Sequence, residues 1–474
     1  MGDRKLPTSW GLPTCPGANG WIVRSFPHIG AGFPYPALVR RVAGHAISIV
    51  CVARIESLAG RLARMGFGDS ERVLPIAETL AGAIAEADAL MLIEDLAKTP
   101  DPDMAIRLLG RLVEDNPALL AELISSPDLR TRLLAVLGVS VALGQHLISH
   151  PSDLQVLRGD ISARSDGELA QELRQAVGAI SADAAVSDRS ACDALRLAYY
   201  RALLRIAARD LGGSKPAGAV PEIAAELSDL ADATVAAALI LARGEVRGWE
   251  NCRLAVLALG KAGAQELNYV SDVDVVFVAQ PALDARGNPV CDNSEAVAIG
   301  TKLASAIMRI TSAHTNAGTI WPIDANLRPE GKVGPLVRTL ASYEAYYQKW
   351  AKGWEFQAML KARPMAGDFE LGQEFADMVW PLVWRVADDP NFVVETQAMR
   401  RRVVSLLPPA EADYEIKLGA GGLRDVEFTV QLLQLVHGRA DERLRIRGTF
   451  PALEALVAHG YIGRKDGMEL RKAY

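Results

Sequence analysis

The stretch LGKAGAQELNYVSDVDVVFV, residues 259–278, sets two aspartates one residue apart directly after a glycine-containing turn. Side chains at positions i and i+2 of a β-strand point to the same face, so we expect Asp272 and Asp274 to project side by side. Two carboxylates held together near a core repel each other unless a cation lies between them. The stretch therefore predicts a strand that starts at a metal site, although an Asp-x-Asp at a strand edge is also common as a solvated turn.

The segments around this pair favour a nucleotide site. Mg²⁺ prefers carboxylate oxygens and usually keeps water and phosphate as its other ligands. A third acid, Asp324, ends the predicted strand TIWPID at residues 319–324, and three acids can hold two metal ions for an in-line phosphoryl displacement. We expect Gly260 and Lys261 to present backbone N–H groups and an ammonium group to phosphates, and Arg328 to add a guanidinium close to Asp324.

The periodicity of apolar residues predicts the secondary structure of the rest of the chain. They recur every three to four positions from about residue 73 to 246, and again from about 343, as in amphipathic helices. Short β-rich runs at 253–259 and 272–279, a helical stretch at 294–311 and the strand ending at 324 predict a small α/β domain. We expect a mostly helical chain with an inserted small α/β domain, divided into a poorly specified segment 1–70, a helical region 71–250, an α/β domain 251–370 and a helical bundle 371–474.

Composition excludes several classes of protein. The 474 residues carry a formal net charge of −6, which gives no general attraction to nucleic acid or to an anionic membrane. The five cysteines are scattered, without CxxC pairs or zinc spacing, and the most apolar window, residues 43–54, is too short to span a bilayer. We expect a cytoplasmic protein. The sequence ends inside an apparently helical pattern without a C-cap Gly or Pro, which indicates a truncated chain.

Four blocks together resemble a known family. Residues 259–278, 323–339 (IDANLRPEGKVGPLVRT), 346–368 and 416–438 resemble, in order, the signature blocks of the bifunctional glutamine synthetase adenylyltransferase/adenylyl-removing enzymes. The resemblance covers about residues 75–474. It implies a nucleotidyltransferase fold of the polymerase-β type, flanked by helical regions and followed by a helical bundle. Members of the family carry two such domains, and this chain has one.

The resemblance also implies a reaction. Glu266, Leu267 and Asn268 resemble the first of the family's two domains, which strips AMP from a tyrosine of glutamine synthetase by phosphorolysis and gives ADP. The second domain, absent here, attaches AMP from ATP. We expect Mg²⁺ as cofactor, with glutamine synthetase and a PII signalling protein as partners. The implied site residues are Asp272, Asp274 and Asp324 for catalysis and metal binding, and Gly260, Lys261, Ser271, Arg328 and Lys361 for phosphate and nucleotide.

Two other functions stay open for this chain, and two further segments are candidates for the nucleotide site. The same domain in the reverse direction would transfer AMP from ATP to a protein tyrosine, and a non-catalytic fragment would only bind glutamine synthetase or PII. Lys361 and Arg363 are candidates to reach the nucleotide from a linking helix. The loop KLGAGGLR, residues 417–424, is either an anion-binding nest of backbone N–H groups or simply a tight turn.

Overall fold

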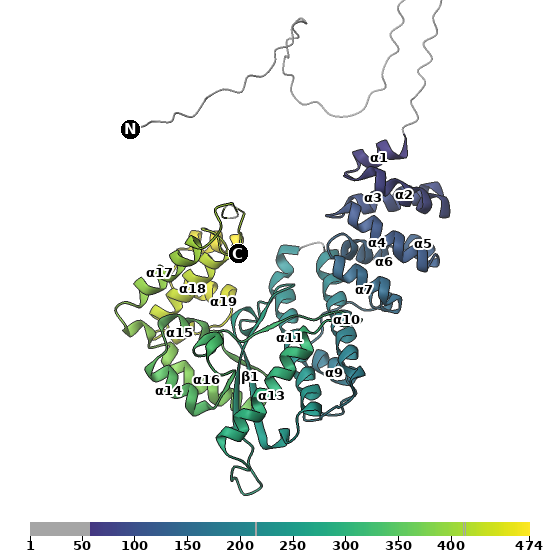
Figure 1. Ribbon diagram of the computed structural model, residues 1–474. Coiled ribbons are helices and arrows are strands. Elements are labelled where there is room, and N and C mark those ends of the chain that lie inside the picture. Colours follow the sequence, from purple (N-terminus) through teal and green to yellow (C-terminus); the bar gives the residue numbers. More distant parts are fainter. Residues whose placement is uncertain (1–56, 214–215, 411, 413) are drawn as a thin grey trace, which may run out of the picture. The chain divides into compact units, whose positions relative to one another are not determined.

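The computed structural model describes residues 57–213, 216–410, 412 and 414–474 (Figure 1). All of them belong to one compact unit, Glu56–Tyr474. Most of the predicted segment 1–70 lies outside the described residues. The expected fold class is confirmed, because helices dominate and enclose a small sheet (Figure 1). The domain boundaries at residues 70, 250 and 370 stay predictions.

Helices account for the regular structure of the described residues before residue 246. Local signals fix their ends: α4, for example, begins with Pro102, and the side chain of Asp101 accepts a hydrogen bond of 2.8 Å from the Met104 backbone N–H. The helices are α1 Leu58–Arg64, α2 Ser70–Ala83, α3 Glu86–Ala97, α4 Pro102–Asp115, α5 Ala118–Ser125, α6 Pro127–Leu137, α7 Val141–Ser149, α8 Leu154–Arg158, α9 Asp166–Ala176, α10 Ser190–Gly212 and α11 Pro216–Glu245.

Helix α10 joins two hydrophobic cores. Its residue Leu204 packs in the core of α1 to α8, whereas Ile206 packs in a second core that includes α9, α11 and one face of the sheet. Both side chains are fully buried. Burying a side chain of this size stabilises the fold by about 1.5–3 kcal/mol, so α10 and α11 anchor the sheet on the helical region.

The sheet has five strands in the order β3-β2-β1-β5, and β4 also pairs with β2. Strand β1 is antiparallel to β2 and β5, whereas β3 and β4 run parallel to β2. The strands, with the helices between them, are β1 Cys252–Ala258, α12 Gly260–Gly263, β2 Val273–Pro281, α13 Asn293–Ser312, β3 Ile323–Asp324, β4 Val337–Arg338, α14 Leu340–Lys349, α15 Gly353–Met359 and β5 Arg363–Gly367.

The alternation along β2 decides which way the aspartates face. Val273, Val275 and Phe277 belong to the core shared with α11 and α13, whereas Val276 and Val278 belong to the opposite core, which includes residues of α14 and α16. Asp272 and Asp274 share the parity of Val276. The two carboxylates therefore point to the side of the sheet on which the C-terminal helices lie.

Two predicted elements differ in the structure. The strand expected at residues 319–324 is reduced to Ile323–Asp324, because Pro322 has no N–H to pair and the Thr319 carbonyl accepts a hydrogen bond of 2.8 Å from the Tyr200 hydroxyl. The prediction that a linking helix carries Lys361 and Arg363 is wrong. Lys361 lies in a turn and Arg363 starts β5, since a proline at position 364 cannot continue a helix.

The remaining helices close the unit. They are α16 Phe369–Val383, α17 Phe392–Ser405, α18 Leu423–His437, α19 Thr449–Ala458 and α20 Arg464–Ala473. Single turns of 3-10 helix lie at η1 Pro151–Asp153, η2 Trp249–Asn251, η3 Gly331–Val333, η4 Val386–Asp388 and η5 Glu442–Leu444. Among the described residues no single helix is long and apolar enough to cross a membrane, although α6 and α7, bent by 120° between them, pass that test as a pair.

Candidate functional site

The turn before β2 is built around the carboxylate of Asp274. The backbone N–H of Leu259 donates a hydrogen bond of 2.8 Å to the carbonyl of Asp274, which brings the turn against the start of the strand. Gly260 follows with φ of 53°, and a Cβ added there would lie 2.1 Å from Oδ2 of Asp274. Only glycine can bring the backbone this close, so the glycine of the turn and the second aspartate form one structural unit.

Three carboxylates gather at this edge of the sheet. Asp324 is the register partner of Asp274 on the parallel strand β3, and Asp272 precedes β2 in an exposed position. Burial, and then the charges of Asp324 and Asp272, raise the pKa of Asp274 to about 6 against the opposing charges of Arg424 and Lys417. The negative charge of Asp274 is therefore poorly compensated by the protein alone.

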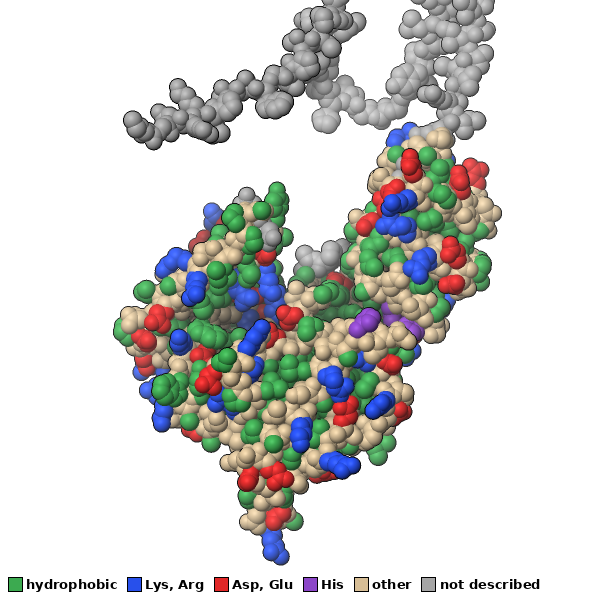
Figure 2. All heavy atoms as spheres, viewed as in Figure 1, with side chains coloured by type: hydrophobic (Ala, Val, Ile, Leu, Met, Phe, Trp, Pro, Cys, Tyr) green, Lys and Arg blue, Asp and Glu red, His purple; other side chains and the backbone are tan. Residues whose placement is uncertain are grey.

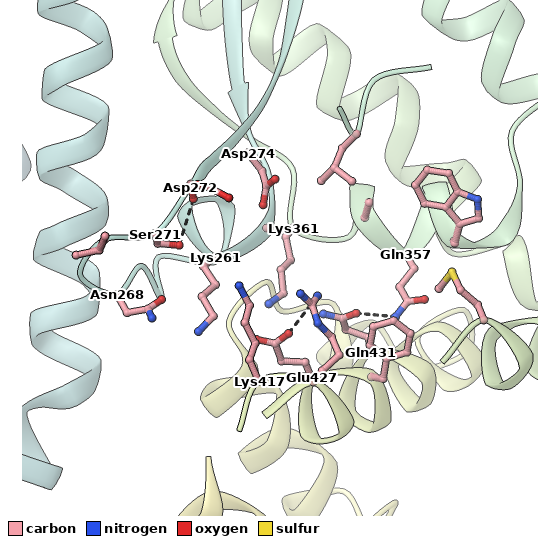
Figure 3. A pocket seen from close by; sticks show the side chains of 18 residues that line it. Lys261, Asn268, Ser271, Asp272, Asp274, Gln357, Lys361, Lys417, Glu427 and Gln431 are labelled. Atoms are coloured by element: carbon pink, nitrogen blue, oxygen red, sulfur yellow. Dashed lines mark hydrogen bonds and ion pairs between the residues drawn. The ribbon is translucent and has the colours of Figure 1, made fainter. Parts of the chain in front are cut away.

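A cavity of about 430 Å³ opens in front of Asp272 and Asp274 (Figure 3). Gly260, Lys261, Asn268 and Ser271 line the same side, and binding of phosphate or nucleotide by Gly260, Lys261 and Ser271 stays a prediction. Ser271 Oγ donates a hydrogen bond of 3.2 Å to the backbone carbonyl of Asp272. The opposite wall comes from α15, α17 and α18 together with the loop before α18, so the cavity lies between the sheet and the C-terminal helices.

Four cations line this cavity: Lys261 on the side of the aspartates, and Lys361, Lys417 and Arg424. Figure 3 shows the three lysines directed into the same space, and Figure 2 shows basic side chains gathered in the hollow beside the C-terminal helices. Burial lowers the pKa of Lys261, and so do the charges of Lys417 and Lys361, although Glu427 and Glu266 oppose that change. A group with several negative oxygens would relieve this repulsion.

Lys361 is the most enclosed of these cations. It is only 5% exposed, and its Nζ lies 3.8 Å from Oε2 of Glu266 and 3.4 Å from Oγ1 of Thr449. Glu266 in turn accepts a hydrogen bond of 3.1 Å from the Phe450 backbone N–H. The Glu-Leu-Asn segment of the sequence therefore ties the α/β part to α19 and holds the lysine at the cavity.

The loop before α18 uses several of its backbone N–H groups in hydrogen bonds of its own. Its backbone N–H groups donate within the loop: those of Lys417 and Leu418 bind Oε1 of Glu415 at 2.9 and 3.0 Å, and that of Gly421 binds Oδ2 of Asp425 at 2.6 Å. The N–H of Arg424 donates to the Lys417 carbonyl at 3.0 Å. The glycines thus permit a tight turn that presents Lys417 and Arg424.

The structure places Arg328 apart from this cavity. Its guanidinium donates to the carbonyls of Ala325 at 2.8 Å and Gly334 at 3.2 Å, which holds the loop after β3. With Asp324 and Asp272 it lines a second cavity of about 680 Å³, so Asp272 borders both spaces. The proposed contact of Arg328 with phosphate stays a prediction.

The donor set suits a hard divalent cation. Among the described residues no group of three acid, His or Cys side chains converges on one point as a metal cage. Carboxylates without a cation repel one another, and the charges of Asp324 and Asp272 add to the rise that burial causes in the pKa of Asp274. Carboxylate oxygens are the ligands Mg²⁺ prefers, and it keeps several of its positions for water and phosphate, so an incomplete protein cage fits it.

Sequence reasoning missed much of the wall that the C-terminal helices supply. It named Lys417 and Arg424 only as the ends of a glycine-rich loop, and it did not select Gln357, Glu427 or Gln431, all of which line the cavity. The basic residues that flank the glycines were the available signal. The two glutamines sit on helices and have no local signature.

Val270, at the rim of the cavity, has φ of 53° and is fully exposed. A β-branched residue in that region is strained, by roughly 1–2 kcal/mol. We expect Val270→Gly to raise the free energy of unfolding by about 1 kcal/mol, because glycine removes the strain and no buried contact is lost. Denaturant unfolding monitored by tryptophan fluorescence measures this, and a less stable variant would contradict the assignment of strain.

Comparison with known sequences identifies the family. A family model described as glutamate-ammonia ligase adenylyltransferase matches residues 130–378, more than half of the chain, and one described as GlnD PII-uridylyltransferase matches residues 396–474. The chain is similar to proteins named bifunctional glutamine synthetase adenylyltransferase/adenylyl-removing enzyme. The protein of Cutibacterium acnes is 52% identical, and the match covers 79% of this chain and 38% of that protein. The protein of Streptomyces avermitilis is 50% identical, with 89% of this chain and 41% of that protein covered, and the protein of Mycolicibacterium smegmatis is 46% identical, with 82% and 38% covered in the same order. The chain spans about two fifths of the length of these curated relatives. It belongs to the glutamate-ammonia ligase adenylyltransferase family.

Proposed function

We propose that this chain removes AMP from an adenylylated tyrosine of glutamine synthetase by phosphorolysis. The observation that carries the proposal is the cavity that Asp272 and Asp274 share with Lys261, Lys361, Lys417 and Arg424. The acids suit a metal ion, and the cations suit the oxygens of phosphate groups. The names of the similar proteins, which include an adenylyl-removing activity, agree with this chemistry.

The proposed reaction balances without a further reactant. An oxygen of inorganic phosphate forms a bond to the phosphorus of AMP, and the bond from that phosphorus to the tyrosine oxygen breaks. The electron pair stays on the phenolate, which takes a proton from water, and the products are ADP and tyrosine. Phosphate is anionic at neutral pH and a phenolate is a good leaving group, so little general-base help is needed.

The chain's own residues then supply positioning and charge. Gly260 lets the backbone turn approach the reacting phosphate, and Ser271 lies beside Asp272 at the cavity wall. The four cations are placed to neutralise the phosphate oxygens in the transition state, which is the larger part of catalysis in phosphoryl transfer. Asp272 and Asp274 would hold Mg²⁺, with Asp324 beside Asp274 on β3, and the ion would supply charge stabilisation to the phosphoryl oxygens.

The direction of transfer rests on Glu266, Leu267 and Asn268, which resemble the adenylyl-removing copy of the family. The second candidate function is transfer of AMP from ATP to a tyrosine, which the same cavity would also accommodate. Two incubations separate them: adenylylated glutamine synthetase with phosphate, scored by ADP release, and unmodified glutamine synthetase with ATP, scored by labelled AMP on protein. AMP incorporation without ADP release would contradict the proposed direction and support transfer of AMP from ATP to the tyrosine.

Arg424 gives a prediction about phosphate. It lines the cavity at the start of α18, and its Nη1 lies 3.5 Å from Oε2 of Glu427. We expect Arg424→Met to raise the KM for phosphate about tenfold with a smaller change in kcat, because a binding charge is lost while the acids remain. Steady-state kinetics with varied phosphate measures this. Arg401→Met, in an exposed position on α17, is the matched control and should leave KM unchanged; equal KM values in both variants would contradict the role of Arg424.

Two protein partners belong to the proposal. Glutamine synthetase supplies the modified tyrosine. A PII signalling protein is the second, supported by the match of residues 396–474 to the PII-uridylyltransferase family model. Copurification of the chain with each partner tests these interactions separately from catalysis.

A further inference from the structure

Two buried glutamines face each other at the wall of the catalytic cavity. Gln357 on α15 is 4% exposed and Gln431 on α18 is 9% exposed, and both line the cavity. Nε2 of Gln357 donates a hydrogen bond of 2.7 Å to Oε1 of Gln431. In Figure 3 the pair lies beyond Lys361 as seen from Asp272 and Asp274. The proposed reaction at the aspartates makes no use of these side chains.

The pair is left with unmet hydrogen-bonding capacity. Oε1 of Gln357 is buried and accepts no hydrogen bond from the described part of the chain, and Nε2 of Gln431 donates none there. Leaving a buried acceptor unpaired costs about 1–3 kcal/mol. The terminal torsion of a glutamine is soft, so a small rotation turns this oxygen into the cavity that the side chain lines. The pair thus offers one acceptor and one donor to a ligand.

The surroundings of the pair are apolar and partly aromatic. Trp354, one turn before Gln357 on α15, lines the same cavity, and so do Leu327, Met399 and Phe428. Flat aromatic rings stack on such side chains, and a base stacked on an aromatic residue gains about 1–3 kcal/mol. Met399 adds a polarizable thioether that adapts to a ring.

We infer that Gln357 and Gln431 read the adenine base of the nucleotide, between Trp354 and Phe428. Adenine offers an amino group as donor at N6 and an acceptor at N7, which a carboxamide donor and acceptor match. Oε1 of Gln357 accepts from N6, and Nε2 of Gln431 donates to a ring nitrogen. The inference rests on the proposed function, because it places the base of the AMP group whose phosphorus is attacked beside Asp274.

A contrast within α18 argues against a purely structural pair. Gln434, three residues after Gln431, is 1% exposed and donates hydrogen bonds of 2.7 Å to the carbonyls of Leu444 and Ile446. That glutamine satisfies backbone groups and does not line the cavity. The Gln357 and Gln431 pair instead leaves its free groups at the cavity, as a ligand-binding pair would.

The test is the base preference of nucleotide binding, measured by calorimetry with ADP and IDP. Inosine replaces the N6 amino group with a carbonyl, so the wild-type chain is expected to bind ADP about tenfold more tightly than IDP. Gln357→Leu and Gln431→Leu are each expected to bring the two affinities within about twofold. Gln434→Leu is the control for removing a buried glutamine from α18, and it should keep the tenfold ratio.

Equal binding of ADP and IDP by the wild-type chain would overturn the inference, as would an unchanged preference in both cavity variants. A ratio is insensitive to partial loss of folded protein, so a destabilised variant still gives a decisive result. ADP release from adenylylated glutamine synthetase is scored separately. Base preference without ADP release would contradict only the proposed function, and ADP release without base preference would contradict only this inference.

Discussion

Asp274→Asn is expected to lower the rate of ADP formation by about a thousandfold or more while the protein becomes more stable. Asparagine keeps the shape of the side chain but removes the charge that would hold Mg²⁺ beside the reacting phosphate. The same charge destabilises the metal-free fold, because burial and the carboxylates of Asp324 and Asp272 raise the pKa of Asp274 to about 6. We therefore expect Asp274→Asn to lower activity and to raise the stability of the metal-free fold.

The stability difference has a defined pH window. A carboxyl whose pKa is raised on folding penalises the folded state above its folded value of about 6, and the penalty disappears below the unfolded value near 3.8. Thermal unfolding in chelator is therefore expected to show a higher Tm for the variant at pH 7.5 and equal Tm values near pH 4. Asp377→Asn, an exposed change on α16, controls for the substitution itself. Wild-type activity in Asp274→Asn would contradict a role of Asp274 in the reaction.

Gly260→Ala is expected to lower activity by about a hundredfold and to destabilise the fold by about 1–3 kcal/mol. The new Cβ would lie 2.1 Å from Oδ2 of Asp274, and the φ of 53° disfavours any residue other than glycine. Either the turn or the carboxylate must move, and a displacement of about 1 Å at a reacting centre costs on the order of a hundredfold in rate.

Gly82→Ala provides the matched control for that change. Gly82 lies in α2, and a Cβ there would meet no atom within 4 Å. Alanine in a helix is more stable than glycine by about 0.5–1 kcal/mol, so this variant should gain stability and keep its activity. Kinetics and thermal unfolding of both variants test the contrast, and a Gly260→Ala enzyme with more than half of wild-type activity would contradict the close approach of the turn to Asp274.

The elements with a strong local pattern could be predicted from the sequence. Strand β1 begins and ends within one residue of its expected range, as do both ends of α13, and the alternation in β2 correctly gave the aspartates a common face. Strand β3 was overestimated because Pro322 and the Tyr200 hydroxyl act across the chain. Strand β5 was missed because it is short and follows a helical pattern, so that only its pairing with β1 defines it.

The candidate site divides in the same way. Gly260, Lys261, Asp272 and Asp274 lie within fifteen residues of one another, so the sequence alone predicted them as a group. The glutamine pair comes from α15 and α18, more than seventy residues apart, and only the packing of these helices brings it to the cavity. Helical periodicity predicts a buried face, but it does not predict which buried glutamine has an unpaired oxygen.

The most direct test of the account is ADP formation by this chain from adenylylated glutamine synthetase, phosphate and Mg²⁺. The account predicts one ADP released for each AMP lost from the tyrosine, loss of the reaction in chelator, and loss in Asp274→Asn under the same conditions. Mass spectrometry of the glutamine synthetase tyrosine peptide, read with an ADP assay, measures both products. A folded chain that leaves the adenylylated peptide intact at saturating phosphate and Mg²⁺ would contradict the proposed function.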